Sequence, residues 1–213
     1  MEIIPSIIAT EFEEVRAKIK RLEDLVTWVE LDVMDGVFVS PLTWPTVKGG
    51  QAPEDLKEID GKTKISAHLM VEYPETLVED WHDFVDRIVV HYESTSNLEK
   101  IIELIGPHVS MAIALELNTP VEKIFEYLGR VKIVQLMSIE RVGYAGEKFD
   151  GRVFEKIKTL KTNWPDVKII VDGGIDLEIA KKLKELGVSG VVVGSRIWQA
   201  ENIEEAISQF ENV

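Results

Sequence analysis

The sequence lacks cysteine, long apolar runs and any excess of basic residues. Without cysteine there are no disulfide bonds, no thiolate nucleophile and no cysteine-ligated metal site. No apolar run approaches the roughly 18 residues that a membrane-spanning helix needs. The formal net charge of −14 repels phosphate backbones and anionic lipids, so we expect neither nucleic acid nor a membrane as a partner. The first residues, with Glu2 among them, are typical of a strand rather than of a signal peptide, which predicts a cytoplasmic protein.

What the chain does have is a regular alternation of short β-branched runs and amphipathic segments over its 213 residues. The β-branched runs predict strands at 3–8, 28–33, 64–70, 87–91, 109–115, 131–137, 167–171 and 190–193. The amphipathic segments predict helices at 11–25, 53–59, 74–84, 96–105, 120–128, 151–162, 177–186 and 203–210. Because no linker interrupts the alternation and 45% of the residues are hydrophobic, we expect a single domain over residues 1–213.

Alternating strands and helices are typical of an α/β fold with a parallel sheet, because parallel neighbours need a crossover connection. Eight strand and helix pairs in a chain of this length predict a single closed (β/α)8 barrel, the TIM barrel. A doubly wound open sheet is the alternative. That fold usually carries a glycine-rich nucleotide loop after its first strand, and the segment found there, IATEF, contains no glycine.

The strand at WVELDVMDG, residues 28–36, contains two acidic side chains that share one face. Successive side chains of a strand alternate between its faces, so Glu30, Asp32 and Met34 point the same way. Burying a carboxylate without a partner is far more costly than any single packing gain. This face is therefore either a solvated polar surface or a site for a bound cation.

Active-site residues of a barrel lie where strands end and the following loops begin. Polar residues and glycines from distant parts of the sequence fall at those positions: Ser6, Glu30, Asp32, His68, His91, Glu93, Ser138, Asp172, Gly173, Gly174, Gly194 and Ser195. Four are candidate metal ligands, Glu30, Asp32, His68 and Asp172, because their three carboxylates repel one another unless a divalent cation neutralises them. His91 either orients one of these groups or is simply a hydrogen-bonded histidine. His108 is expected at the surface.

Two turns with glycine follow the last two predicted strands. They are VDGGI at 171–175 and VGSRI at 193–197, and each exposes backbone N–H groups where barrels of this type usually bind phosphate. A third loop, VGYAGEKF from Val142, carries Gly143 and Gly146 and can close over a ligand. These loops predict a phosphorylated ligand.

The segments PSIIATEF, LDVMDGVFV, AHLMVEYPE, VVHYEST, GYAGEKF, VDGGI and VGS occur in the order found in ribulose-phosphate 3-epimerases. The chain resembles that family over nearly its whole length, and the segments are specific as a set. The resemblance implies an isomerase, a metal-dependent epimerase that interconverts D-ribulose 5-phosphate and D-xylulose 5-phosphate through a metal-stabilised cis-enediolate. A homo-oligomer with one divalent metal ion per site and a phosphorylated ketose as its substrate is expected.

The resemblance also implies roles for individual residues. Asp32 and Asp172 would be metal ligands and the acid/base pair, and His68 would bind both metal and substrate. Further substrate contacts would come from Ser6 and from the cradle of Gly143, Tyr144, Ala145, Gly146, Gly173, Gly174, Gly194 and Ser195. Met34, Met70 and Met137 resemble the family's sulfur-lined cap, with ordinary core methionines as the alternative.

The sequence departs from the family pattern at the predicted metal site and in two loops. Glu30 stands where the family has histidine, which would leave three oxygen ligands and one nitrogen and favour manganese, iron(II) or magnesium over zinc. Alternatively, Glu30 does not bind the ion. In the loops, Pro41 replaces an asparagine, Ala145 a glycine and Glu147 a glutamine.

These departures leave other functions open. The chain could be an epimerase for a related ketose phosphate such as a hexulose 6-phosphate, a metal-dependent lyase of related barrel type, or a non-catalytic barrel that binds a phosphosugar with an impaired metal site. Trp44, in the long loop after the second predicted strand, is a candidate for a subunit contact, with ordinary core or surface packing as the alternative.

Overall fold

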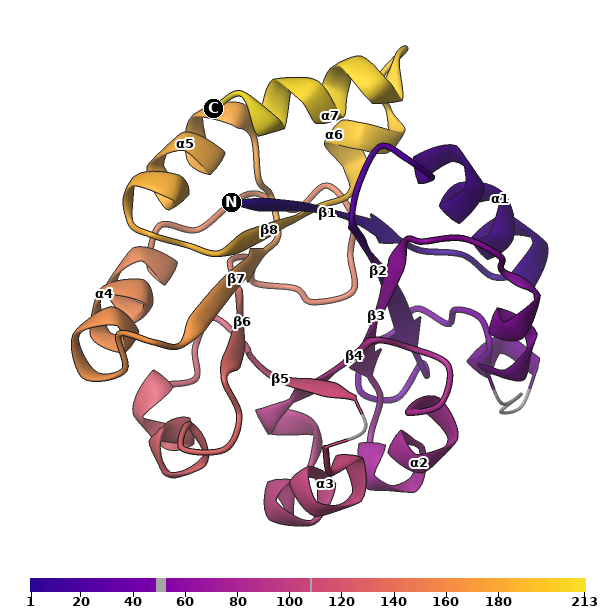
Figure 1. The fold of residues 1–213 in the computed structure, drawn as a ribbon. Coiled ribbons are helices and arrows are strands. Elements are labelled where there is room, and N and C mark those ends of the chain that lie inside the picture. Colours follow the sequence, from indigo (N-terminus) through magenta and orange to yellow (C-terminus); the bar gives the residue numbers. More distant parts are fainter. Residues whose placement is uncertain (49–52, 108) are drawn as a thin grey trace.

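Eight parallel strands close into a barrel in the computed structural model, which describes residues 1–48, 53–107 and 109–213. The strands are β1 (Glu2–Ile7), β2 (Trp28–Met34), β3 (Lys64–Met70), β4 (Arg87–His91), β5 (Ser110–Leu115), β6 (Ile133–Met137), β7 (Lys168–Asp172) and β8 (Gly190–Val193). Each strand pairs with the next along the chain, and β8 pairs with β1 to close the ring. The predicted (β/α)8 barrel is confirmed, with its helices outside the strands (Figure 1).

The outer layer mixes α-helices with shorter 3-10 helices. The α-helices are α1 (Phe12–Leu22), α2 (Val78–Trp81), α3 (Leu98–Ile105), α4 (Val153–Asn163), α5 (Leu177–Glu185), α6 (Ser195–Trp198) and α7 (Ile203–Glu211). The 3-10 helices are η1 (Thr46–Lys48), η2 (Pro53–Glu58), η3 (Pro74–Thr76), η4 (Tyr92–Ser94) and η5 (Val121–Tyr127). None of the described helices is both long and apolar enough to cross a bilayer. His108 lies outside the described residues.

Three predicted helices therefore need correction. The segments predicted at 53–59 and 120–128 form the 3-10 helices η2 and η5, and the one at 74–84 divides into η3 and α2. The 3-10 form rises about 2.0 Å per residue against 1.5 Å for an α-helix. The two forms have about 3.0 and 3.6 residues per turn, so over a segment this short they place apolar side chains on nearly the same face, and periodicity alone does not separate them.

Alternation along the strands divides the core into two layers. Val29, Leu31 and Val33 of β2 face outward and pack in the same cluster as the buried side of α1. A smaller cluster fills the barrel interior and consists of Ile4, Val89, Ala112, Ala114, Ile133, Ile170 and Val192. The interior is thus packed, and functional side chains can occupy only its carboxyl-terminal end.

Strand register aligns the polar side chains at that end. On β2 and β3, Asp32 pairs with His68 and Met34 with Met70, and on β6 and β7 Met137 pairs with Asp172. Residues that pair across parallel strands lie at one level of the barrel. The register therefore brings the ends of β2, β3, β6 and β7 to a common floor.

The long loop after β2 is tied back to the end of that strand. The Thr43 hydroxyl donates to the Asp32 carbonyl at 2.8 Å and accepts from the Met34 N–H at 2.8 Å. Next to it, Trp44 is only 4% exposed and packs against Phe12 and Trp81. Trp44 is thus a core residue, and the packing alternative is correct.

Candidate active site

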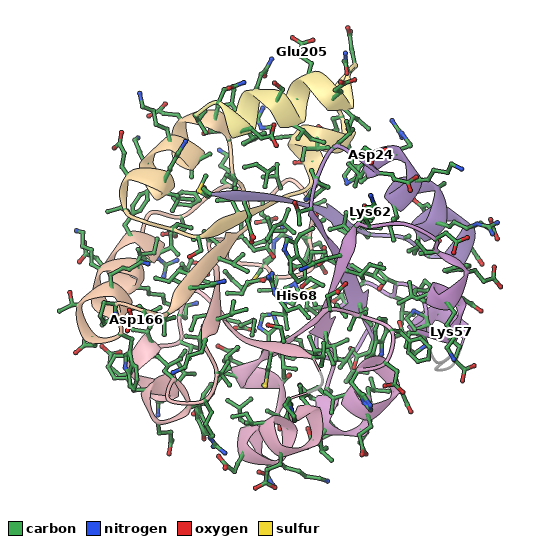
Figure 2. The ribbon with its side chains drawn as sticks, in the orientation of Figure 1. Asp24, Lys57, Lys62, His68, Asp166 and Glu205 are labelled. Atoms are coloured by element: carbon green, nitrogen blue, oxygen red, sulfur yellow. The ribbon has the colours of Figure 1, made fainter. Side chains whose placement is uncertain are left out.

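One histidine nitrogen faces three carboxylates at the floor of the barrel mouth. His68 lies near the centre of the barrel, inside the ring of strands (Figure 2). Its Nδ1 atom is 3.3 Å from Asp32 Oδ1, 3.6 Å from Glu30 Oε1 and 3.8 Å from Asp172 Oδ2. The structure therefore brings the four predicted ligands together from β2, β3 and β7.

Burial makes the ionised forms of these groups costly. It raises the pKa of Asp32 to about 7 and raises the pKa of Glu30. The pKa of Asp172 lies well above its usual value because of burial and then the charges of Asp32 and Glu30. Burial also lowers the pKa of His68, so the imidazole does not supply a lasting positive charge. The charge of Arg87 partly offsets burial at Glu30, but the pKa of each of the three carboxyl groups is still raised.

Glu30 is fully buried and held by two hydrogen bonds. The Ser66 hydroxyl donates to its Oε2 atom at 3.0 Å, and the Gln135 side-chain amide donates to Oε1 at 2.8 Å. Neither Ser66 nor Gln135 was among the predicted site residues. Ser66 lies two residues before His68 and Gln135 two residues before Met137, so both share the inward face of their strands. A polar residue at an inward position of an apolar strand is the signal that would have found them.

The side chains fit a divalent cation. Ligand atoms of Glu30, His68 and Asp172 all lie within 4.8 Å of one another. Asp32 Oδ1 is buried, has no hydrogen-bond partner and adjoins His68. Carboxylate oxygens with one imidazole are a donor set that magnesium, manganese, iron and zinc accept. Three of the four predicted ligands, Glu30, His68 and Asp172, could thus hold such an ion, and Asp32 adjoins them.

A cavity of about 670 Å³ opens above this floor. Both Asp32 and Asp172 line it, whereas Glu30 and His68 are fully buried beneath and are not among its described lining residues. Its wall includes the other residues predicted to bind substrate: Ser6, Gly143, Tyr144, Ala145, Gly146, Gly173, Gly174, Gly194 and Ser195. A small ligand in the cavity would therefore meet the two aspartates from above.

Two glycines allow the loops around the cavity to approach closely. Gly174 has φ +65°, and a Cβ atom there would lie 2.4 Å from the backbone nitrogen of Phe149. At Gly194 a Cβ atom would lie 2.7 Å from the Ser6 hydroxyl. The loop after β7 thus packs closely against the loop after β6, and the loop after β8 against the end of β1, because these positions have no side chain.

Comparison with known proteins identifies the family. The sequence model of the ribulose-phosphate 3 epimerase family matches residues 2–198. The chain belongs to this family. It is 30% identical to ribulose-phosphate 3-epimerase of Candida glabrata, over 97% of this chain and 89% of that protein, and 30% identical to the Bacillus subtilis enzyme, over 99% and 98%. These relatives are carbohydrate epimerases, so the family is one of isomerases.

Solved structures with little sequence identity share the barrel. The 3-hexulose-6-phosphate synthase from Salmonella typhimurium superposes with a TM-score of 0.73 at 15% identity, covering 100% of this chain and 97% of that one. Orotidine 5'-phosphate decarboxylase from Pyrococcus horikoshii OT3 gives 0.68 at 16%, covering 99% and 97%. At this identity the likeness concerns the fold alone.

The three methionines that resemble the family's cap cluster at the mouth with Val39 and Val142. Met70 and Met137 line the cavity, whereas Met34 is fully buried behind them. Met70 and Met137 are thus placed as a sulfur-lined cap would require, whereas Met34 is an ordinary core methionine.

His91 lies on the far side of His68 from the carboxylates. It is fully buried, and its Nε2 atom is 2.9 Å from Nε2 of His68. This contact favours the interpretation in which His91 orients a member of the epimerase family's metal site. Its other ring nitrogen, Nδ1, faces Glu93 at 3.5 Å.

Proposed function

We propose that the chain is a metal-dependent epimerase that interconverts D-ribulose 5-phosphate and D-xylulose 5-phosphate. The observation that carries this proposal is that Asp32 and Asp172, from β2 and β7, line one small cavity and flank one histidine nitrogen. Inverting a carbon by proton transfer needs two acid/base groups that reach the same atom from different sides. Family membership and the names of the relatives support the same reaction.

In the proposed mechanism, one aspartate removes the proton from C3 and the other returns a proton to the opposite face of the planar enediolate. An efficient general base has a pKa near the working pH. In the metal-free protein burial raises the pKa of Asp32 to about 7, and a divalent ion beside it would lower that value. Asp172, whose pKa is also raised, would be the protonated partner in one direction and the base in the other. By microscopic reversibility, the reverse reaction follows the same steps, and the two aspartates exchange their roles as acid and base.

Glu30, Asp32, His68 and Asp172 would hold the metal ion beneath the substrate. When bound, a divalent ion would make the C3 proton more acidic and stabilise negative charge as it develops on the sugar oxygens. Ser66 and Gln135 fix the carboxylate of Glu30 by hydrogen bonds, so its orientation is set before any ion arrives. Glu30 in place of the family histidine would favour manganese, iron(II) or magnesium over zinc.

The phosphate would bind in the loops after β6, β7 and β8. Gly143, Gly146, Gly173, Gly174, Gly194 and Ser195 line the side of the cavity that these loops form. Tyr144 and Ala145 stand between the first two glycines, and Ser6, at the end of β1, lies beside Gly194. We further propose a single domain over residues 1–213 that forms a homo-oligomer in the cytoplasm.

The proposal is tested with protein stripped of metal and assayed for conversion of ribulose 5-phosphate to xylulose 5-phosphate. Activity should be absent after treatment with EDTA and return with Mn²⁺, Fe²⁺ or Mg²⁺. In D₂O the product should gain one deuterium at C3. Full activity in EDTA, or turnover of a hexulose 6-phosphate in place of the pentulose, would contradict the proposed metal dependence or the proposed substrate, respectively.

A further inference from the structure

We propose that Glu93 and His91 are positioning residues that determine which nitrogen of His68 carries the proton, and so keep bare the nitrogen that faces the carboxylates of the barrel mouth. The chain of contacts runs from Glu93 through His91 to His68, and its members come from β4, the turn after it and β3. The inference rests on the proposed function only in treating His68 as a metal ligand. It concerns binding of the ion, and so it can fail or succeed independently of the substrate.

The contact between the two histidines is a hydrogen bond in the plane of the rings. Their Nε2 atoms are 2.9 Å apart, the ring planes differ by 14° and the ring centroids are 5.0 Å apart. Nitrogen atoms of stacked faces could not approach so closely without overlap, so the rings meet edge to edge. Lone pairs and N–H bonds of imidazole lie in the ring plane. One proton therefore lies between the two Nε2 atoms, donated by one ring and accepted by the other.

Glu93 decides the direction of that bond. The Nδ1 atom of His91 and the Oε2 atom of Glu93 are both buried, neither has a hydrogen-bond partner of ordinary geometry, and they face each other at 3.5 Å. An ionised carboxylate can only accept, so the proton of His91 resides on Nδ1. Burial alone would raise the pKa of Glu93, but its hydrogen bond with His91 and other neighbours lower the pKa below the usual value.

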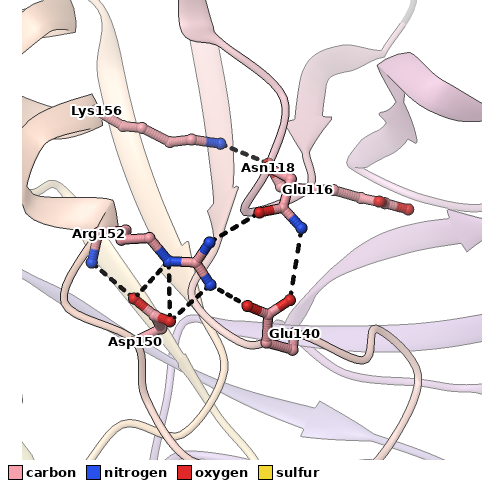
Figure 3. A network of polar contacts seen from close by, with 6 residues as sticks. All are labelled: Glu116, Asn118, Glu140, Asp150, Arg152 and Lys156. Carbon is pink, nitrogen blue, oxygen red and sulfur yellow. Dashed lines mark hydrogen bonds and ion pairs between the residues drawn. The ribbon is translucent and has the colours of Figure 1, made fainter.

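Glu93 is itself held in place by the loop after β5. Its Oε1 atom accepts the backbone N–H of Glu116 at 2.9 Å. The carbonyl of Glu116 in turn accepts a hydrogen bond from Lys156 of α4 (Figure 3). One oxygen of the Glu93 carboxylate is thus held by a backbone N–H group, and the other faces His91.

The proton position on His91 determines that on His68. With its proton on Nδ1, neutral His91 must accept at Nε2, so His68 donates from its own Nε2 and keeps Nδ1 free of hydrogen. That bare Nδ1 lone pair faces Glu30, Asp32 and Asp172. A lone pair opposite carboxylate oxygens is repulsive unless a cation or a carboxyl proton lies between them. Histidine ligands of metals commonly donate their other N–H to an outer partner in this way.

The reverse arrangement is disfavoured by the same geometry. If His91 donated from Nε2 and were neutral, its Nδ1 lone pair would face the carboxylate of Glu93. His68 would then carry its proton on Nδ1 and hydrogen-bond an aspartate, leaving no nitrogen for the ion. Glu93 therefore selects the tautomer that binds metal.

The direct test is a long-range ¹H–¹⁵N spectrum of the histidine rings in the zinc-loaded, otherwise unsubstituted protein. His91 should appear with its proton on Nδ1 and His68 with its proton on Nε2. This measurement needs no variant, so it does not depend on how any substitution folds. A spectrum with the proton of His68 on Nδ1, or of His91 on Nε2, would overturn the inference.

The role of Glu93 is then measured by Glu93→Gln with Glu116→Gln as its matched control. Glutamine has only one acceptor oxygen for the two N–H groups that Glu93 serves. The affinity of the metal-free protein for Co²⁺ should fall about 10- to 100-fold, and kcat at saturating metal should fall with KM nearly unchanged. Glu116→Gln removes an equal charge nearby but keeps the backbone N–H, so Co²⁺ affinity should stay within about twofold of the parent.

Two outcomes contradict the assignment of Glu93. One is Co²⁺ affinity and histidine spectra in Glu93→Gln that match the parent protein. The other is an equal loss in Glu116→Gln, which would indicate general charge or a second ion, since ligand atoms of His91, Glu93 and Glu116 also lie within 4.8 Å of one another. If the parent protein binds Co²⁺ with the expected tautomers but turns over no pentulose phosphate, the proposed function fails and this inference stands.

Discussion

Acidic side chains occur in two contrasting settings, the floor of the barrel mouth and a network beside it on the loops after β5 and β6. In the network, Asp150 and Glu140 both accept from Arg152, which also donates to Asn118 at 2.8 Å (Figure 3). Hydrogen bonds from Arg152 lower the pKa of Asp150. At the mouth, burial raises the pKa of Asp32 to about 7. The same residue type is thus stabilised as an anion in one place and penalised in the other.

The difference lies in what the protein supplies as a counterion. The network provides a guanidinium in water, where an exposed ion pair contributes little to stability. To its three buried carboxylates the mouth provides the imidazole of His68, which burial keeps neutral, and the charge of Arg87, which acts on Glu30 but does not outweigh burial. Such a cluster is costly for the folded chain alone. A divalent ion bound between the carboxylates would offset this cost. A cluster that is costly without a ligand and stabilised by one is typical of a binding site.

The largest expected effect comes from removing either acid of the mouth. Asp32→Asn and Asp172→Asn should each lower kcat by about 10²- to 10⁴-fold, because each would lose proton transfer at C3 as well as a ligand. The assay is conversion of ribulose 5-phosphate with excess metal. As a control from the outer network, Glu140→Gln should keep activity within about twofold. If both aspartate variants were as active as the parent protein, the mechanism with two acid/base aspartates would be wrong.

The next effect is a pH dependence of stability in the metal-free protein. Asp32 binds its proton more tightly when folded, with a pKa of about 7 against a usual value of 3.8. The folded state then holds more protons than the unfolded state between about pH 4 and 7, so the free energy of unfolding should fall as pH rises through that window. The loss from this group is on the order of a few kcal/mol.

Urea denaturation at several pH values measures this slope. Saturating Mn²⁺ should remove most of it, because the ion stabilises the ionised carboxylates. Asp32→Asn should reduce the slope without added metal, and the raised pKa values of Glu30 and Asp172 should maintain the remainder. A metal-free protein whose stability rises steadily from pH 4 to 7 would show that the mouth acids are stabilised by the chain itself.

A smaller effect is expected from changing the ligand chemistry at position 30. Glu30→His restores the histidine of the family and should shift preference from manganese towards zinc by on the order of tenfold, about 1.4 kcal/mol. Competitive titration of both ions against a fluorescent chelator gives the ratio. Ser66→Ala serves as a control, since it removes a hydrogen bond to Glu30 but no ligand. An unchanged ratio in Glu30→His would mean that Glu30 does not bind the ion.

The smallest effect is expected in the outer network. Arg152→Ala should change Tm by no more than about 2 °C, because the pairs it makes with Asp150 and Glu140 are exposed and screened by salt. Thermal unfolding followed by circular dichroism measures the shift. A loss of 8 °C or more would show that this network is as important to stability as the buried core.

Much of the fold could be predicted from the sequence, because the spacing of apolar residues and the runs of β-branched residues indicate which side chains are buried. All eight strands lie where the pattern predicts them, with ends that differ by one or two residues. What the pattern missed is the form of the crossovers. The stretch around Val121–Tyr127 is amphipathic at helical spacing, yet it adopts a 3-10 helix that spans the gap between β5 and β6. Over so few turns, repeats of about 3.0 and 3.6 residues place apolar side chains on nearly the same face, so local periodicity does not separate the two forms.

The candidate site was predictable where alternation and strand ends determine it. Asp32, His68 and Asp172 meet at the mouth because each stands at an inward position near the end of its strand. Their roles in chemistry remain predictions. The hydrogen bonds from Ser66 and Gln135 to Glu30, and the orientation of the His91 ring, depend on side-chain torsions and packing that no single segment encodes.

Calorimetric titration of the metal-free protein with Mn²⁺ at pH 7 tests the central claim most directly. The account predicts one ion per chain, with binding weakened at least about 100-fold by Asp172→Asn and unchanged by Glu140→Gln. Absence of binding, or binding that Asp172→Asn leaves intact, would contradict the claim that the barrel-mouth acids form a cation site.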